Sequence, residues 1–386
     1  MQYRKFGKLD WKVSALGFGA MRLPVIGDNP AAGNPDINEP EAIKMIRYAI
    51  DQGVNYLDTA YPYHGGKSEV VVGNALKDGY REKIKLATKM PSWLVQQYED
   101  FDKYLNEQLI KIQTDHIDFY LLHGLNKQHW PKLRDLDVLK WAENAITDGR
   151  IRNLGFSFHD DLDMFKQIVD ASDQWNFCQI QYNFMDIEYQ AGTKGLKYAA
   201  DKGLGVVIME PLRGGQLAKE PPESVKKIWE SSQIKRTPAD WALQWLWNQP
   251  EVSVVLSGMS AMQQVIENIT SAEHSAIGSL VEKELSLIDE AREKYRKLSP
   301  IPCTNCGYCM PCPNGVNIPH AFHYYNDAMM YDDPRTARFR YRQEAKEAWA
   351  DNCIECLECE EKCPQGIPIS EWLKKAHEFL GPRKKT

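Results

Sequence analysis

The chain has 386 residues, of which 43% are hydrophobic and 26% are charged. This length and composition allow one large domain and a smaller one, each with its own hydrophobic core. The net charge of -6 excludes the basic surface typical of nucleic-acid-binding proteins, and no apolar run is long enough to span a membrane. The first ten residues are polar, unlike a secretion signal, so we expect a cytoplasmic protein with neither nucleic-acid nor membrane partners.

Short apolar segments alternate with amphipathic ones between residues 13 and 297, a pattern typical of parallel strands joined by helices. Before them, residues 3–13, with a turn at 7–10, predict a hairpin that closes the N-terminal end of a barrel. Eight strands, the number that closes a (β/α)8 TIM barrel, are predicted at 14–19, 55–58, 84–88, 117–122, 151–156, 177–181, 205–209 and 252–256. We therefore expect such a barrel over residues 1–298.

Helical periodicity is expected between these strands, for example at 41–52 and 137–147, where apolar residues recur every three or four positions. Thr237 and Pro238 indicate the N-cap and first residue of a helix that continues to residue 247. A doubly wound open sheet is the alternative. It is disfavoured because the glycines at 17 and 19 lack the third glycine of a dinucleotide-binding turn.

Eight of the nine cysteines lie after residue 302, in two groups with regular spacing. The second group matches the ferredoxin pattern C-x2-C-x2-C-x3-C-P, whereas only two residues precede the last cysteine of the first group. Structural zinc sites would not require a third regular step and a closing Cys-Pro, and disulfides do not suit a reducing compartment. The predicted iron–sulfur ligands are Cys303, Cys306, Cys309, Cys312, Cys353, Cys356, Cys359 and Cys363.

In two-cluster ferredoxins the fourth cysteine of each run binds the other cluster. We therefore expect one [4Fe-4S] cluster on Cys303, Cys306, Cys309 and Cys363, and a second on Cys353, Cys356, Cys359 and Cys312. The composition changes at the linker 299–302, so a small, mainly helical ferredoxin-like domain is predicted over residues 299–386. Cys178, alone in an apolar run, is predicted to be a small buried hydrophobic residue.

Four polar residues follow predicted strands, at the barrel end where this fold carries its catalytic groups: Asp58, Tyr63, Lys89 and His123. Each could have an ordinary structural role, as a loop cap, a packed aromatic ring, a solvated strand end or a core histidine. Taken together, Asp58 supplies the counter-charge for Lys89, whose ammonium is expected to lower the pKa of Tyr63 from about 10. Tyr63 would protonate a carbonyl oxygen that His123 orients, which indicates carbonyl reduction by hydride.

Further motifs occur in order along residues 1–297: Asp58-Thr-Ala-x-x-Tyr63, Thr88-Lys89, Asp118-Phe-Tyr-Leu-Leu-His123, Arg150-Ile-Arg-Asn-Leu-Gly-Phe-Ser157, Gln179-Ile-Gln-Tyr-Asn183, Pro211-Leu-Arg-Gly-Gly215 and Gly258-Met-Ser-x-x-x-Gln264-x-x-Glu267-Asn268. This set resembles the aldo-keto reductase family. The family's catalytic tetrad corresponds to Asp58, Tyr63, Lys89 and His123, and the resemblance implies an NAD(P)H-dependent oxidoreductase.

The resemblance also implies a set of cofactor contacts. These are Gly19, Ala20 and Met21 beneath the nicotinamide ribose, together with Asp58; Ser157 and Gln179 at the carboxamide; Met209, where the family often has a stacking aromatic; Pro211, Leu212, Arg213, Gly214 and Gly215 at the pyrophosphate; and Gly258, Ser260, Gln264, Glu267 and Asn268 at the adenosine. Phe158 stands where the family commonly has Asn. No Lys or Arg occurs within 258–268 to bind a 2'-phosphate, so we expect NADH to be used at least comparably to NADPH.

Met21, His64, Trp93 and Trp130 are expected to line the substrate pocket, which suggests a small or medium aldehyde or ketone, or the corresponding alcohol. The sequence shows no flavin site that would convert two-electron into one-electron transfer. The ferredoxin-like domain is therefore expected either to exchange electrons with a redox partner protein or to serve as a docking module. Two other readings stay open: a binding subunit that senses the nicotinamide redox state, and a ferredoxin-linked oxidoreductase whose clusters are the main redox centres.

Overall fold

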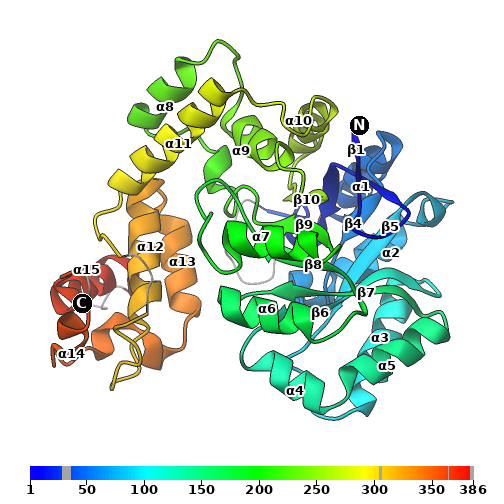
Figure 1. Ribbon diagram of the computed structural model, residues 1–386, viewed down its shortest axis with the longest axis horizontal. Helices are drawn as coiled ribbons and strands as arrows, with labels where there is room; N and C mark the ends of the chain where they lie inside the picture. Colours follow the sequence, from blue (N-terminus) through cyan, green and yellow to red (C-terminus); the bar gives the residue numbers. More distant parts are fainter. Residues whose placement is uncertain (28–35, 304–306, 364, 383–386) are drawn as a thin grey trace. The chain divides into compact units, whose positions relative to one another are not determined.

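The computed structural model describes residues 1–27, 36–303, 307–363 and 365–382 (Figure 1). Its contacts divide the chain into two compact units: Met1–Lys219 with Arg236–Leu285, and Glu220–Lys235 with Ser286–Thr386. This division differs from the expected boundary at residue 298, because most of helix α11 (Glu282–Lys297) groups with the second unit. The ring of Tyr295 in α11, for example, lies 5.4 Å from that of Tyr331.

In the described residues of the first unit, eight parallel strands form a closed barrel, which confirms the predicted TIM-barrel class (Figure 1). Each of the eight predicted segments overlaps one of them, with ends that differ by up to three residues. Their bounds are β3 Leu16–Gly19, β4 Tyr56–Asp58, β5 Lys85–Met90, β6 Ile117–Leu125, β7 Ile151–Phe158, β8 Trp175–Gln181, β9 Gly205–Met209 and β10 Val254–Gly258.

Helices of the first unit follow the strands along the chain. Their bounds are α1 Glu39–Asp51, α2 Ser68–Ala75, α3 Glu99–Ile112, α4 His129–Asp135, α5 Val138–Thr147, α6 Leu162–Asp170, α7 Gly192–Asp201, α9 Pro238–Trp247 and α10 Met262–Glu273. The predicted cap of α9 is confirmed: the side chain of Thr237 accepts a hydrogen bond from the backbone N–H of Asp240, and Pro238 begins the helix.

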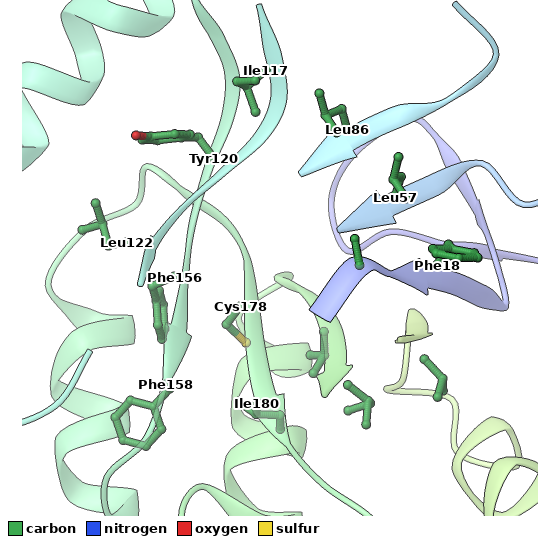
Figure 2. Close-up of a cluster of buried hydrophobic side chains, with 14 of the residues drawn as sticks. Phe18, Leu57, Leu86, Ile117, Tyr120, Leu122, Phe156, Phe158, Cys178 and Ile180 are labelled. Carbon is green, nitrogen blue, oxygen red and sulfur yellow. The ribbon is translucent and has the colours of Figure 1, made fainter. Parts of the chain in front are cut away.

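Successive side chains of a barrel strand point alternately into the barrel and toward the helices, and both environments are apolar. On β6, Phe119 and Leu121 belong to the cluster inside the barrel, whereas Tyr120 and Leu122 belong to the larger core outside it (Figure 2). Both faces of a barrel strand are buried, so neither face selects for polar residues. Cys178 of β8 is fully buried in the outer core, as predicted.

The N-terminal hairpin forms as predicted, from the antiparallel strands β1 Tyr3–Lys5 and β2 Lys12–Ser14. Directly after β1, Phe6 is fully buried and its ring lies 4.9 Å from that of Phe119 inside the barrel. A Cβ on Gly205 would lie 2.5 Å from the Phe6 ring, so this strand position has no room for a side chain. The hairpin therefore closes the N-terminal end of the barrel and leaves the other end for chemistry.

The second unit is mainly helical, as expected. Its described elements are α8 Glu223–Glu230, most of α11, α12 Ile318–Met330, α13 Pro334–Gln343, η5 Lys346–Ala348, η6 Ala350–Asn352, α14 Glu358–Glu361 and α15 Ile369–Leu380. A small core joins α12, α13, η6 and α15, with Phe322, Tyr341 and Leu373 among its buried members. Within the described ranges of the chain, no helix combines the length and apolarity needed to cross a membrane.

Candidate active site and cysteine pockets

Strand alternation brings the candidate catalytic side chains to the inside of the barrel. Tyr56, Ala87 and Leu121 lie in the inner cluster, and Asp58, Lys89 and His123 each follow one of them by two residues. Side chains two positions apart point to the same face of a strand. The inner hydrophobic layer thus ends where the polar residues begin, at the C-terminal end of the strands.

Lys89 is the centre of this polar layer. Its Nζ lies 2.6 Å from Oδ1 of Asp58, 2.8 Å from the carbonyl oxygen of Thr59 and 3.3 Å from the hydroxyl of Tyr63. An ammonium group has three N–H donors, and these three acceptors use all of them. The structure therefore joins Asp58, Lys89 and Tyr63, as the sequence predicts.

The charges on this group follow from burial and pairing. Lys89 is only 1% exposed, which alone would lower its pKa, but the Asp58 carboxylate and the Tyr63 hydroxyl raise the pKa of Lys89 above its ordinary value. Lys89 therefore keeps its proton. The second carboxylate oxygen of Asp58, Oδ2, is buried and has no hydrogen-bond partner among the described residues.

Tyr63 corrects one expectation. Burial is the largest influence and raises the pKa of Tyr63, while the Lys89 ammonium lowers it and the Asp58 carboxylate raises it. The net direction is upward, so the expected net lowering by Lys89 is wrong. Sequence spacing reveals the neighbouring ammonium but not how far the phenol is desolvated. Tyr63 is consequently held as a protonated donor, and Lys89 stabilises the phenolate that would remain after proton release.

His123 faces the same space as Tyr63. The two rings meet edge to face with centroids 6.2 Å apart, and the Trp93 ring lies 5.1 Å from that of His123. Burial, and then the Lys89 charge, hold the pKa of His123 well below its usual range, so the imidazole is neutral near pH 7. Its Nδ1 has no partner among the described residues.

A tight turn presents Tyr63. The segment η2 Tyr63–Gly66 has positive φ angles at His64, Gly65 and Gly66. A positive φ is unfavourable for a histidine. A hydrogen bond holds His64 in this conformation: its Nε2 accepts from the backbone N–H of Leu23 at 3.1 Å. Leu23 directly follows η1 Ala20–Arg22, so His64 ties the Tyr63 turn to the segment expected to lie beneath the nicotinamide.

A pocket of about 550 Å³ opens above Tyr63 and His123. Of the four expected lining residues, Met21, His64 and Trp93 are present. Trp130 is not: it is 3% exposed and packs in the core, with its ring 5.9 Å from that of Trp175. The residues that sequence reasoning missed are Pro62, Gly124, Asn126, His129 and His159.

The expected carboxamide contacts lie side by side. Ser157 and Gln179 are direct neighbours in the β7–β8 register, and both are almost fully buried. Oε1 of Gln179 has no hydrogen-bond partner among the described residues, so it can accept from an amide N–H. Phe158 points the other way, into the outer core, where its ring lies 5.1 Å from that of Phe165 (Figure 2). It therefore leaves Ser157 and Gln179 unobstructed.

The remaining expected cofactor residues surround the same end of the barrel. Gly19, Asp58, Met209 and Gly258 end β3, β4, β9 and β10, respectively. In the loop 211–215, positive φ angles occur at Arg213, Gly214 and Gly215, and Arg213 pairs with Asp186 at 3.4 Å. In the expected adenosine segment, Oε1 of Gln264 accepts from the backbone N–H of Ser260, Asn268 donates to Ser257, and Glu267 accepts from Gln263.

The second unit holds two cysteine-lined pockets. One is lined by Cys312, Cys353, Cys356 and Cys359, and also touches Cys309. The other is lined by Cys303, Cys309 and Cys363. Cys306 lies outside the described residues. The fourth cysteine of each run therefore faces the pocket formed mainly by the other run, which fits the expected crossing. Within the described residues, no group of three or more His, Cys, Asp or Glu side chains is placed to hold a single metal ion. The cysteines instead surround these two pockets.

Comparison with known families agrees with this arrangement. The family model described as Aldo/keto reductase family matches residues 15–293, well over half of the chain. The chain belongs to the aldo-keto reductase family. A second model, described as a 4Fe-4S dicluster domain, matches residues 302–367. The protein is thus an aldo-keto reductase family oxidoreductase with an iron–sulfur domain after its barrel.

Two curated relatives illustrate the family's range. L-galactose dehydrogenase of Arabidopsis thaliana is 27% identical over 323 residues, which cover 78% of this chain and 97% of the relative. NADH-specific methylglyoxal reductase of Escherichia coli is 26% identical over 309 residues, covering 69% of this chain and 91% of the relative.

Solved structures of aldo-keto reductases are also similar to this chain. The holo form of AKR11C1 from Bacillus halodurans has a TM-score of 0.62 and 27% sequence identity, and covers 75% of this chain and 96% of that chain. The thermostable aldo-keto reductase Tm1743, in complex with the inhibitor epalrestat, has a TM-score of 0.61 at 25% sequence identity. The match covers 75% of this chain and 100% of that chain.

Proposed function

We propose that this aldo-keto reductase reduces an aldehyde or ketone to an alcohol, or catalyses the reverse reaction, with a nicotinamide cofactor in the barrel mouth. One observation carries the proposal: the hydrogen-bonded chain from the buried Asp58 and Lys89 to Tyr63 ends at the pocket that also exposes the neutral His123 ring. This arrangement offers a proton donor, a charge that stabilises the donor's conjugate base, and a hydrogen-bonding group for the substrate oxygen.

The residues present fit the cofactor. The unpartnered Oε1 of Gln179 suits the carboxamide N–H, and the glycines at 214 and 215 allow the close backbone approach that a pyrophosphate needs. When bound, the reduced nicotinamide supplies the hydride. We propose the contacts implied by the resemblance, from Gly19 to Asn268, as the binding residues.

The protein's own groups then have separate tasks. Tyr63 gives its hydroxyl proton to the carbonyl oxygen, and the Lys89 ammonium stabilises the resulting phenolate. Asp58 keeps Lys89 charged and oriented, at 2.6 Å. His123, kept neutral by burial, positions the carbonyl oxygen without competing as an acid.

We further propose that NADH is used at least comparably to NADPH. The segment 258–268 contains no Lys or Arg, and Gln264 is engaged with Ser260. A 2'-phosphate would therefore find no cationic partner in this segment. The similarity to a relative named an NADH-specific methylglyoxal reductase supports the use of NADH.

The test of the proposed reaction is a steady-state assay under anaerobic conditions. The full-length protein is mixed with NADH or NADPH and a panel of simple aldehydes and ketones, and nicotinamide oxidation is followed by absorbance. Oxidation with at least one carbonyl, and with NADH at least comparably, is expected. Nicotinamide binding without turnover of any carbonyl would instead favour a redox-sensing subunit.

For the second unit we propose two [4Fe-4S] clusters, one on Cys303, Cys306, Cys309 and Cys363, and one on Cys353, Cys356, Cys359 and Cys312. The two cysteine-lined pockets support this assignment. The clusters would exchange electrons with a partner protein or stabilise a docking surface. Carbonyl reduction by a folded Cys356→Ala/Cys359→Ala variant separates these roles from catalysis, because an unchanged rate would exclude an obligatory part for the clusters in hydride transfer.

A further inference from the structure

The two cysteine runs share the spacing C-x2-C-x2-C but differ in the residues that stand between the cysteines. The first run, from Cys303 to Cys312, contains no Asp, Glu, Lys or Arg. The second run, from Cys353 to Cys363, contains four glutamates and one lysine. Only the second run is therefore acidic.

Leu357, in the second run, is exposed in a backbone conformation that leucine seldom adopts. Its φ angle is 64°, and the residue is 48% exposed. The first run has Gly307 at the matching position, directly after its second cysteine, with a φ angle of 75°. Glycine adopts a positive φ without steric cost, whereas leucine pays for it and here also leaves apolar surface in water. Neither feature stabilises the chain on its own, which points to a contact made with another molecule.

A second exposed apolar side chain adjoins Leu357. Ile354 is 67% exposed, and both residues line the pocket that Cys356 also lines. Cys356 is itself exposed, whereas the other described cysteines of this pocket are half-buried. A protein that covered Ile354 and Leu357 would therefore lie directly against this cysteine pocket.

Exposed carboxylates accompany the two apolar residues. Three of the four glutamates of the run are exposed, namely Glu355, Glu358 and Glu361. The fourth, Glu360, is engaged inside the unit, where its Oε1 accepts from the backbone N–H and the hydroxyl of Ser370 at 2.8 and 2.6 Å. Lys362 lies 3.9 Å from Glu358, and an exposed pair of this kind is weak, so Glu358 stays available to a cation on a partner.

We infer that Ile354 and Leu357, with the exposed glutamates of the second run, form the docking surface for an electron-transfer protein that has a basic rim around an apolar centre. The inference rests on the two proposed clusters and adds the run that the partner meets and the chemistry of its surface. Opposite charges speed the encounter, and a desolvated apolar centre slows dissociation. One electron passes between the adjoining cluster and the partner's redox centre, and no bond or proton changes place.

The test uses ferricytochrome c, a basic one-electron acceptor, as the probe of this surface. Succinylated cytochrome c, whose lysines carry carboxylates instead, is the matched probe of opposite charge. The full-length protein is reduced with dithionite, desalted and mixed with either probe in an anaerobic stopped-flow instrument. The bimolecular rate constant for native cytochrome c should be at least about tenfold the larger at low ionic strength and should fall as salt is added. Equal rate constants for the two probes would overturn the inference.

A pair of double variants separates the docking surface from the net charge of the protein. Glu355→Gln/Glu358→Gln should lower the rate constant for cytochrome c at least about threefold and weaken its salt dependence. Glu282→Gln/Glu290→Gln is the matched control, because it removes the same charge from exposed positions on α11. The control should keep the wild-type rate constant. Equal losses in the two double variants would show that overall charge alone attracts the probe, which refutes the assigned surface.

Leu357→Gly tests the apolar centre, since it gives the second run the residue that the first run has at this position. The dissociation constant for cytochrome c, measured by calorimetric titration, should rise at least about fivefold while the iron content stays at the wild-type value. Phe339→Ala, at a position 46% exposed on α13, is the matched control and should bind like the wild type. Unchanged affinity in Leu357→Gly would refute the apolar centre, and a loss of iron would assign Leu357 a structural role instead.

Two further measurements distinguish the possible failures. Iron and sulfide counts on the purified protein address the clusters: a protein without them refutes the proposed clusters and with them the electron transfer. A protein with full clusters whose binding ignores Glu355, Glu358 and Leu357 refutes the docking surface alone. Sedimentation addresses a second copy of the chain as the occupant. A dimer that Leu357→Gly dissociates would show that the surface serves self-association, which overturns its assignment to a redox partner.

Discussion

The carboxylate of Glu69 accepts a 2.7 Å hydrogen bond from the hydroxyl of Thr88, the residue directly before Lys89. Gln108 donates to the same carboxylate at 2.6 Å and to the backbone carbonyl of Lys89 at 3.1 Å. Glu69 is fully buried. A second acidic group, which sequence reasoning did not identify, therefore stands behind the proposed catalytic lysine and fixes its strand end.

Replacement of Glu69 by Gln tests its charge separately from its hydrogen bonds. The amide oxygen can still accept from Thr88 and Gln108, but the negative charge near Lys89 is lost. Less negative potential favours the Tyr63 phenolate and so lowers the pKa of Tyr63. Since carbonyl reduction needs Tyr63 protonated, the alkaline limb of the kcat profile should move to lower pH. An unmoved limb with a uniformly lower rate would indicate a purely structural role.

Lys89→Met should destabilise the protein more than most single substitutions. It leaves the buried Asp58 carboxylate without its partner, and an uncompensated buried charge costs about 3–5 kcal/mol in unfolding free energy. The double variant Asp58→Asn/Lys89→Met removes both charges and should recover much of that loss. Urea unfolding of the wild type, the single variants Lys89→Met and Asp58→Asn, and the double variant measures the coupling. Additive effects would show that the 2.6 Å ion pair contributes no coupling energy.

Tyr63→Phe should lower kcat for carbonyl reduction by about 10²–10⁴-fold, because a positioned general acid contributes that much. The dissociation constant for NADH should stay within about twofold, since the hydroxyl is not a proposed cofactor contact. Tyr61→Phe is the matched control. Its hydroxyl bonds Glu107 rather than the pocket groups, so it should retain the wild-type kcat. Comparable losses in the two variants would contradict the role of Tyr63.

Several features of the fold were predictable because they depend on local sequence. Apolar runs identify strands whose two faces are both buried, and polar residues that interrupt such a run, like Lys89 after Thr88, identify the end that carries chemistry. The cap at Thr237 and the hairpin before Phe6 also follow from neighbouring residues. The burial of Cys178 could be predicted from the apolar residues around it in the sequence.

Other features depend on how distant segments meet. The sequence around Trp130 does not reveal which face of α4 turns inward, and the structure buries this ring against Trp175. His159 follows β7 and His129 begins α4, so only the closed barrel brings both to one pocket. The pKa of Tyr63 likewise depends on desolvation, which is a property of the folded pocket. A histidine within two or three residues of a predicted strand end is the signal that could have found His159.

The neutral state of His123 predicts an acid-sensitive stability. Its pKa in the folded protein lies well below the value of about 6.5 expected for an unfolded chain. Between these two values the unfolded state binds more protons, so the free energy of unfolding falls as the pH drops below about 6.5. Urea unfolding at several pH values should show this decrease in the wild type. The free energy of unfolding should depend less on pH in His123→Gln. A slope that stays at the wild-type value in a folded His123→Gln variant would remove His123 as the cause.

The crossing of the cysteine ligands can be tested by counting iron in double variants. Cys312 lines the pocket of Cys353, Cys356 and Cys359, so Cys312→Ala and Cys356→Ala should each remove the same cluster. Their double variant should then keep half of the wild-type iron and sulfide.

The double variant Cys312→Ala/Cys303→Ala removes one ligand from each pocket. It should lose nearly all of the iron and sulfide, because an incomplete thiolate set holds the cluster poorly. Cys178→Ala, in the barrel core, should retain full iron. In an uncrossed arrangement Cys312 and Cys303 would bind the same cluster, so their double variant would keep half of the iron. The Cys312→Ala/Cys356→Ala variant would then lose nearly all of it.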